Sequence, residues 1–329
     1  MQTLIIGRDI AMQDYLANQI RGEMQAGKAG IVVAADSHLI ESAVHSWKDV
    51  HHAHGWEQFH WIQLGYSASF SFPMNLTQTP KALLDTWSAL HLPGYVEFQE
   101  AVFWYAHREE TATIFELNDY FLLQRFKETR GVNLGELIIE EAISLFSPLK
   151  PQVGQRENRI NMRHWLEDGH WIFFDVSQLE QTLRNFIAEY MSILYENEQN
   201  DQSVFITNGI PPFPRIQRFE NLISIFSHMD DWENWIRENQ ERRFVLFSTT
   251  AEEAKRLNDL GIASINTDAS SLKPREFISV CQAGEQRSFV PQRENPPVSA
   301  SLKHQIQEKD GFPRERVLSL LREQEEVGR

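Results

Sequence analysis

Short apolar runs alternate with longer segments of helical periodicity over much of this chain. Most of the runs are rich in leucine, isoleucine, valine and phenylalanine, as in strands that are buried on both faces. The runs occupy residues 4–6, 30–36, 59–66, 170–176, 203–208, 222–228 and 243–249. Helical segments follow several of them, and a long amphipathic one covers residues 178–198. This alternation predicts an α/β fold with a mostly parallel sheet flanked by helices.

Glycine and small polar residues mark where the first helices are expected to begin and end. The first helix follows Gly7 and stops at Gly27, because glycine readily adopts the conformation that ends a helix. The second helix follows Asp36, with Ser37 as its N-cap, since a serine side chain accepts a hydrogen bond from a free backbone N–H. Much later, residues 275–290 predict a β-hairpin that turns at an alanine–glycine pair.

The middle of the chain departs from this alternation. Residues 79–160 show helical patterns rich in aromatic residues, and they are expected to form an all-α insertion. Because basic residues are sparse among the aromatics, a helical core is favoured over base stacking. Residues 1–78 and 161–290 then form the α/β core. Residues 291–329 predict a proline-containing linker and a C-terminal helix, with Pro313 near its first position.

The overall charge narrows the range of partners. The chain of 329 residues has a net charge of −15, and an acidic surface repels nucleic-acid phosphates. This argues against direct DNA binding over most of the surface.

A single cysteine, Cys281, excludes an intramolecular disulfide and suits a reducing compartment. No signal peptide is evident and no apolar run reaches the roughly 18 residues of a membrane span, so a cytoplasmic protein is expected.

The junction at Gly7 has the layout of a phosphate-binding loop but lacks most of its residues. Such a loop reads G-x-x-x-x-G-K-[ST], in which the lysine reaches the phosphates and the hydroxyl holds Mg²⁺. The octet here is "GRDIAMQD". Met12 stands at the second glycine, Gln13 at the lysine and Asp14 at the hydroxyl. Taken alone, it is a strand–glycine–helix junction that any α/β protein could contain.

Several later segments carry weak motifs whose order is informative. "GIVVAADSHLIES" is similar to the pattern "gvvviDPkGdlie" and keeps its aspartate, Asp36. "WIQLGYSASFSFPMNL" ends like an "fNpL" turn, with Asn75 and Leu76 in place. "HWLEDGHWIFFDVS" is similar to "ldegkillvDLs", with Asp175 and Ser177 matching. Nearer the C-terminus, "LKPREFISVCQAGEQRSF" is similar to "L.pgeFvv...G....f", and "GFPRERVLSLL" to "yg.pR..Ve".

This ordered series resembles the motor domain of HerA/FtsK-type P-loop ATPases, in particular the coupling-protein ATPases of conjugation and type IV secretion. The resemblance covers nearly the whole chain. It implies a P-loop NTPase-like fold of the RecA/HerA type, whose five core strands have an order like 5-1-4-3-2. It also implies that Gly7, Arg8 and Asp36 are the remnant of a nucleotide site.

The chain departs from this family where the family's chemistry is carried out. The resemblance places altered residues at the lysine, the hydroxyl, the Asp-Glu pair of the second acidic strand and the sensor glutamine: Gln13, Asp14, Thr207 with Asn208, and His228. Phosphoryl transfer depends on stabilisation of negative charge by the lysine and the metal. Their joint loss predicts a pseudo-ATPase without catalytic residues. No cofactor or metal is expected, and ATP with Mg²⁺ would bind only if the altered site still accepts it.

One family function could survive this loss. In the family, an arginine before the sensor strand can reach the nucleotide of a neighbouring subunit, and Arg218 or, second, Arg215 stands there. A solvent-facing arginine near a turn explains the same residues and is the favoured interpretation. A second group, five histidines between His45 and His60, is better explained as a solvated helix end than as a zinc site, since their side chains cannot all converge.

These features favour a structural or regulatory subunit of a larger assembly of the conjugation, type IV secretion or defence type. Its partners would be proteins, such as an active ATPase or secretion components, in a homo- or hetero-oligomer. Two alternatives remain: a divergent but active ATP-dependent DNA translocase subunit, and an α/β adaptor unrelated to P-loop ATPases.

Overall fold

The computed structural model describes residues 2–7, 10–51, 55–65, 70–71, 80–108, 145, 162–210, 219, 221–226, 243–261, 268–281, 284–292, 295–313, 315 and 319. Among these residues, no helix is both long enough and apolar enough to cross a membrane.

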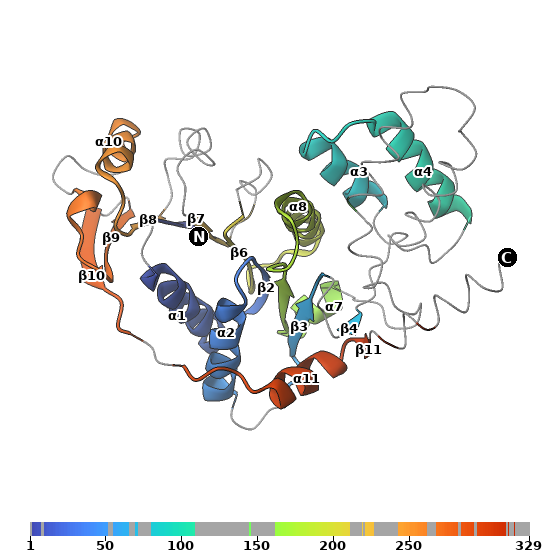
Figure 1. Ribbon diagram of the computed structural model, residues 1–329, viewed down its shortest axis with the longest axis horizontal. Helices are drawn as coiled ribbons and strands as arrows, with labels where there is room; N and C mark the ends of the chain where they lie inside the picture. The colour runs from blue at the N-terminus through green and yellow to red at the C-terminus, as the bar shows by residue number, and fades with distance from the viewer. Residues whose placement is uncertain are drawn as a thin grey trace. The chain divides into compact units, whose positions relative to one another are not determined.

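A nine-stranded sheet is the centre of the fold (Figure 1). Its strands are β1 (Gln2–Ile6), β2 (Ala29–Ala34), β3 (Phe59–Gln63), β5 (Trp171–Asp175), β6 (Ser203–Asn208), β7 (Leu222–Phe226), β8 (Arg243–Leu246), β9 (Glu276–Cys281) and β10 (Gly284–Phe289). They lie in the order β10-β9-β8-β1-β7-β6-β2-β5-β3. Two short strands, β4 (Phe70–Ser71) and β11 (Phe312–Pro313), pair separately.

The predicted strand order is confirmed in the middle of the sheet. Strands β8, β1, β7, β6 and β2 are neighbours, and each adjacent pair is parallel. Numbered one to five in chain order, these strands read 5-1-4-3-2. The predicted hairpin is also confirmed, because β9 pairs antiparallel with both β8 and β10.

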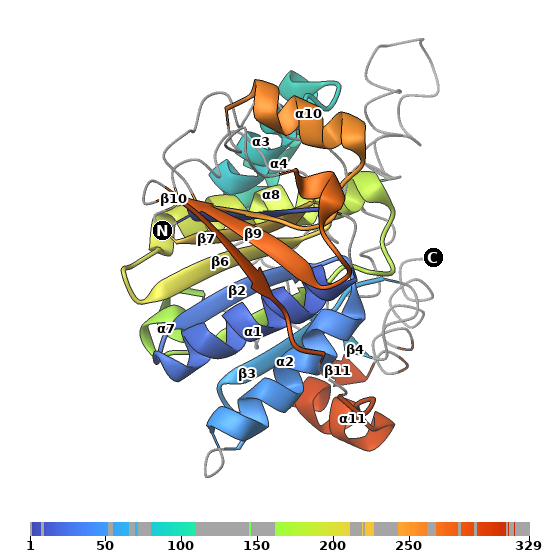
Figure 2. The same cartoon turned by 90° about the vertical axis from the view of Figure 1, so that its left-hand side faces the viewer.

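Helices connect and cover these strands. They are α1 (Ala11–Gln25), α2 (Ser37–Val50), α3 (Pro80–Ala89), α4 (Tyr95–Arg108), α7 (Met162–Glu167), α8 (Gln181–Glu198), α10 (Ala251–Asp259) and α11 (Ala300–Glu308), with a short 3₁₀ helix at Ala269–Ser271. The crossovers from β1 to β2 and from β2 to β3 advance in the same direction across the sheet. Right-handed crossovers of this kind bring their helices to one face, and α1 and α2 lie side by side there (Figures 1 and 2).

Residue contacts divide the chain into two compact units. Unit 1 comprises residues 1–59, 164–173 and 198–299, and unit 2 comprises residues 60–163, 174–197 and 300–329. The division predicted from the sequence, with a core and an insertion at 79–160, stays a prediction. Within that range α3 and α4 are helical, and most of the remainder lies outside the described residues.

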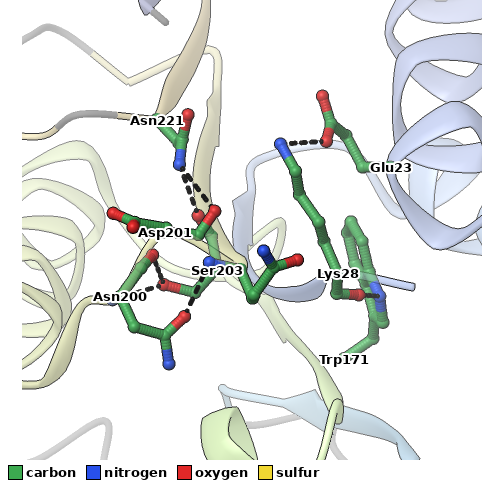
Figure 3. Close-up of polar contacts among 8 residues, drawn as sticks. Glu23, Lys28, Trp171, Asn200, Asp201, Ser203 and Asn221 are labelled. Carbon is green, nitrogen blue, oxygen red and sulfur yellow. Dashed lines mark hydrogen bonds and ion pairs between the residues drawn. The ribbon is translucent and has the colours of Figure 1, made fainter. Parts of the chain in front are cut away.

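The core of unit 1 explains why its strand β2 is wholly apolar. All six residues of β2 are buried, and α1 turns Leu16, Ile20 and Met24 inward at successive helical turns. Gly30 is required in β2, since a Cβ there would lie 2.5 Å from the ring of Trp171. The indole of Trp171 also donates to the carbonyl of Lys28 at 2.7 Å (Figure 3).

Short polar contacts fix the start of the strands in unit 1. The Asn221 amide donates to the carbonyl of Ser203 at 3.2 Å, which ties the residue before β7 to the first residue of β6 (Figure 3). Lys28, just before β2, pairs with Glu23 of α1 at 2.7 Å (Figure 3). These contacts lie at the amino ends of the strands and leave the carboxyl ends for other side chains.

Unit 2 is organised by tryptophans. Trp87 of α3 stacks on Phe98 of α4, with ring centroids 3.9 Å apart. The Trp61 indole of β3 donates to the buried carboxylate of Asp175 at 3.3 Å, and that carboxylate also accepts from the Ser177 hydroxyl at 2.6 Å. Asp175 and Ser177, which match the family motif, therefore hold the carboxyl end of β5 together.

One predicted helix start is wrong. The N-cap of α2 is Asp36, not Ser37: Asp36 has extended backbone angles, and its carboxylate accepts from the backbone N–H of His38 at 2.9 Å. In the C-terminal region α11 begins at Ala300, the last residue of the predicted linker at residues 291–300. Pro313 lies in β11, where it pairs with Phe70, and Glu315, two residues later, is helical. Proline suits such a short edge strand because it needs no backbone donor there.

Candidate functional site

The site implied by the resemblance lies at the carboxyl ends of β1 and β6 in unit 1. Gly7 follows β1 with a φ of 147°, a conformation that favours glycine. A Cβ at this position would lie 2.7 Å from the Cβ of Phe247, which follows β8. The Phe247 N–H donates to the carbonyl of Ile6 at 2.8 Å. Close packing against Phe247, the residue after β8, is therefore enough to explain the glycine at this position, and no bound phosphate is needed to explain it.

Gln13 and Asn208 form a reciprocal pair of side-chain amides. The Gln13 Nε2 donates to Asn208 Oδ1 at 3.2 Å, and the Asn208 Nδ2 donates to Gln13 Oε1 at 3.1 Å. Gln13 lies in the first turn of α1, and Asn208 is the last residue of β6 and only 2% exposed. Each amide donates one hydrogen bond to the other and accepts one from it. This neutral pair, called the Gln13–Asn208 clasp, joins α1 to β6.

Thr207 is engaged on the other side of β6. Its hydroxyl lies 2.8 Å from the hydroxyl of Ser224, the residue directly opposite in β7, and both side chains are fully buried. This pair satisfies two hydroxyls inside the sheet, where an unpaired one would be costly. The pair is neutral and holds no carboxylate that could bind a metal.

Asp14 forms an ion pair with Arg275, the residue directly before β9. Its carboxylate lies 2.5 Å from Nη2 of Arg275, whose Nε and Nη2 also donate to the carbonyls of Val290 and Pro291, each at 2.8 Å. Arg275 has a φ of 69°, which is unusual for a residue other than glycine. The family pattern "L.pgeF" has a glycine at this position, so the arginine departs from the pattern while its backbone keeps the conformation that glycine favours.

An aromatic cluster lies beside this ion pair. The ring of Tyr15 packs edge-on against Phe277 and Phe247, with centroid distances of 5.0 and 5.8 Å. Burial raises the pKa of the Tyr15 hydroxyl, and the charge of Arg243 opposes that rise. The tyrosine is therefore neutral at physiological pH.

Asp36, expected as part of a nucleotide-site remnant, caps its own helix. Its carboxylate accepts from the backbone N–H of His38, and the neighbouring Ala35 N–H donates to the carbonyl of Asn208 at 3.1 Å. Capping of a helix by aspartate is a sufficient reason for this residue type at this position.

The remaining predicted site residues lie outside the described part of the chain: Arg8, Arg215, Arg218 and His228. Their roles stay predictions.

Of the histidine cluster, His45 contacts the carbonyl of Pro296 at 2.7 Å, His51 packs on Trp47, and His60 contacts Asp310 at 2.8 Å. Within the described ranges, no group of three or more histidine, cysteine, aspartate or glutamate side chains could hold a metal ion.

Comparison with known proteins gives a likeness of structure without one of sequence. No protein-family model matches the chain, and no curated protein sequence matches it. Among solved structures, VirB4 of Thermoanaerobacter pseudethanolicus matches with a TM-score of 0.55 at 12% identity, over 90% of each chain. The plasmid coupling protein TrwB, bound to the GTP analogue GDPNP, matches with a TM-score of 0.59 at 9% identity, over 91% of this chain and 88% of TrwB.

The chain has the fold of TrwB and VirB4. The P-loop NTPase-like fold predicted from the sequence is therefore confirmed. TrwB has also been solved with an ATP analogue and with ADP and Mg²⁺, and these structures match this chain over the same 91% of its length. At identities of 9% to 12% the likeness shows the fold alone, and the chemistry has to be argued from the side chains.

Sequence reasoning missed the partners of the predicted residues. The glutamine–asparagine pair joins positions 195 residues apart, and no local pattern reports such a contact. Arg275 could have been noticed, because it stands at a glycine of the quoted pattern and follows a proline. Ser224 could not have been noticed, because the sequence does not show that its strand lies beside the strand of Thr207.

Proposed function

We propose that this chain is a relative of the HerA/FtsK-type ATPases of conjugation and type IV secretion that neither binds nor hydrolyses ATP, and that it is a cytoplasmic structural or regulatory subunit of a larger assembly. The fold likeness to TrwB and VirB4 supports the kinship with these ATPases. The proposed loss of ATP binding and hydrolysis rests on the side chains at the carboxyl ends of β1 and β6.

The observation that carries the proposal is the Gln13–Asn208 clasp. The resemblance puts a phosphate-binding lysine at the first residue and a member of the acidic pair at the second. Here both are amides, and each satisfies the other. A nucleotide phosphate would have to break this neutral clasp and would gain no cation from either residue.

The neighbouring substitutions support the same conclusion. The Asp14 carboxylate stands where a hydroxyl would bind Mg²⁺, and its charge is already paired with Arg275. Thr207 is buried against Ser224 and has no carboxylate to offer a metal. With the clasp, four positions that would handle negative charge and metal are thus committed to contacts within the protein: Gln13, Asp14, Thr207 and Asn208.

An active nucleotide hydrolase with a divergent site is the second candidate. It is favoured by one fact, that TrwB with the same fold binds nucleotide analogues. In this case Arg8 and Asp36 would contact the nucleotide, and binding would require the clasp to open.

Titration calorimetry with ATP and Mg²⁺ separates the two candidates. The proposal expects no saturable heat for the wild-type chain. The variant Gln13→Lys/Asn208→Glu, which restores both charges, is the matched test of whether the clasp is the obstacle. Micromolar ATP binding by the wild-type chain that is abolished by Arg8→Ala would overturn the proposal and favour the active enzyme.

A regulatory role in trans has its own test. If Arg218 reaches the nucleotide of an active partner ATPase, the Arg218→Ala chain should lower that ATPase's turnover in a mixed complex, while Arg215→Ala should have a smaller effect. Unchanged turnover with both variants would remove the arginine-finger idea and leave the structural role standing.

A further inference from the structure

Strand β3 is the last strand of the sheet on the side of β5. The Leu64 N–H, directly after β3, donates to the carbonyl of Asp175 at 2.9 Å, and the carbonyl of Gln58, directly before β3, accepts from the first residue of β5. Because backbone groups alternate in direction along a strand, the even-numbered residues face β5, and the backbone groups of Trp61 and Gln63 face the outer edge. Edges of this kind can pair with a further strand, and natural proteins usually cover or block them.

The C-terminal region contributes to the cover of this strand. All five residues of β3 are buried, although it is the last strand of the sheet. Residues 300–313, here called the C-terminal strap, comprise α11, the turn after it and β11. Helix α11 lies beside β3 (Figure 1), and β11 pairs antiparallel with β4 beyond it.

The two ends of α11 contact opposite faces of β3. Successive side chains of a strand point to opposite faces, so His60 and Trp61 lie on different sides of the sheet. Lys303, in the first turn of α11, places its Nζ 4.6 Å from the ring centroid of Trp61. His60 Nδ1 lies 2.8 Å from the carboxylate of Asp310 and 3.0 Å from Nζ of Lys309, both just past the end of α11. A helix that contacts both faces of the last strand has to cross its outer edge.

Polar contacts carry much of the attachment of the strap. Of the nine residues of α11, only Ile306 and Gln307 are buried, and Ile306 alone is apolar. The carboxylate of Asp310 contacts both His60 and the ammonium of Lys309, the latter at 3.3 Å. These three residues, here called the strap anchor, are joined by one anion. Its removal leaves a buried imidazole and a partly buried cation without their partner, which is unfavourable in the closed arrangement.

From this crossing and this anchor we infer that the C-terminal strap is a detachable cover of the β3 edge, which uncovers the outer backbone groups of Trp61 and Gln63 when the contacts of Asp310 are broken, while the rest of the sheet stays folded. The strap thereby controls whether the sheet can be extended at β3. The inference uses contacts within unit 2 and does not depend on whether the chain binds nucleotide.

Hydrogen exchange followed by mass spectrometry tests the cover in the full chain. Asp310→Ala removes the anion of the strap anchor. Peptides that contain residues 59–63 and 300–309 are expected to exchange at least about tenfold faster than in the wild-type chain, because the strap opens locally. Residues 29–34 of β2 are expected to exchange at the wild-type rate. Asp310→Asn, which keeps an acceptor for His60 but loses the charge, should give a smaller increase in the same peptides.

A matched control is available on the same helix. Glu308→Ala also removes a carboxylate from the end of α11, but this side chain is 64% exposed and pairs with His304 of the same helix. Its exchange should equal that of the wild-type chain in every segment. Unchanged exchange of residues 59–63 in Asp310→Ala overturns the inference. Equal acceleration of β2 overturns it as well, because the strap would then open only with the whole protein, and so does a Glu308→Ala effect as large as that of Asp310→Ala.

Discussion

The guanidinium of Arg275 lies 2.5 Å from the carboxylate of Asp14, and it reaches that position from a residue with a φ of 69°. A non-glycine residue in this conformation costs on the order of 1 kcal/mol or more. The arginine offsets the cost with its ion pair and its hydrogen bonds to the carbonyls of Val290 and Pro291. Two departures from the family pattern, 261 positions apart, therefore compensate each other.

This relationship predicts an unusual order of stabilities at position 275. Arg275→Ala should destabilise the protein by about 2–3 kcal/mol, because it loses the side-chain bonds and keeps the strain. Arg275→Gly loses the same bonds but relieves the strain, so it should be about 1 kcal/mol more stable than the alanine variant. Urea denaturation measures both. An alanine variant as stable as the glycine variant would mean that the backbone is not strained.

The Gln13–Asn208 clasp should appear in a double-mutant cycle as a coupling between the effects of the two substitutions on the free energy of unfolding. Gln13→Ala leaves the buried Asn208 amide without its partner and should cost about 1–3 kcal/mol of unfolding free energy. After Asn208→Ala, the same change should cost at least about 1 kcal/mol less. Gln25→Ala, on the exposed end of the same helix, is the matched control and should show no coupling to Asn208. Additive effects of Gln13→Ala and Asn208→Ala would contradict the clasp.

Two glycines near α1 should respond to alanine with opposite signs. Gly7→Ala puts a Cβ 2.7 Å from that of Phe247 in an unfavourable φ, and should destabilise by about 2–4 kcal/mol. Gly22→Ala lies within α1 with no atom within 4 Å of the added Cβ, and should stabilise by about 0.5–1 kcal/mol. Thermal denaturation of both variants checks the pair. A neutral Gly7→Ala would show that the turn can relax.

The strands were predictable because burial on both faces of the sheet leaves an apolar run, as in β2 and in the residues Val204–Ile206 of β6. Their order was predictable only through the resemblance, since spacing along the chain does not say which strands are neighbours. The N-cap of α2 was misassigned by one residue because Asp36 and Ser37 are both good caps, and only the backbone angles distinguish them. The clasp joins residues with no sequence proximity, and its geometry follows from the completed sheet.

His60 predicts an acid-sensitive contribution to stability in unit 2. Burial lowers the pKa of its imidazole from the usual 6.5, and Lys309 lowers it further, while the hydrogen bond and charge of Asp310 oppose the shift. The unfolded chain therefore takes up this proton first, and stability should fall as the pH drops below about 6.5 and through the lower folded-state pKa.

His60→Asn removes this titrating group. The difference in unfolding free energy between about pH 7.5 and about pH 5 should be smaller for the variant than for the wild-type chain. Chemical denaturation at each pH measures it. A variant with an unchanged or steeper dependence on pH would show that the carboxylates alone account for acid sensitivity.

The clasp between Gln13 and Asn208 has one more property. Neither amide has a charge for salt to screen or a proton that titrates, so the joint between α1 and β6 is the same in dilute and concentrated salt and across the physiological pH range. A lysine and a carboxylate at these positions would respond to both conditions and to the arrival of a phosphate. In the proposed subunit this contact between α1 and β6 therefore stays in place when salt or pH changes.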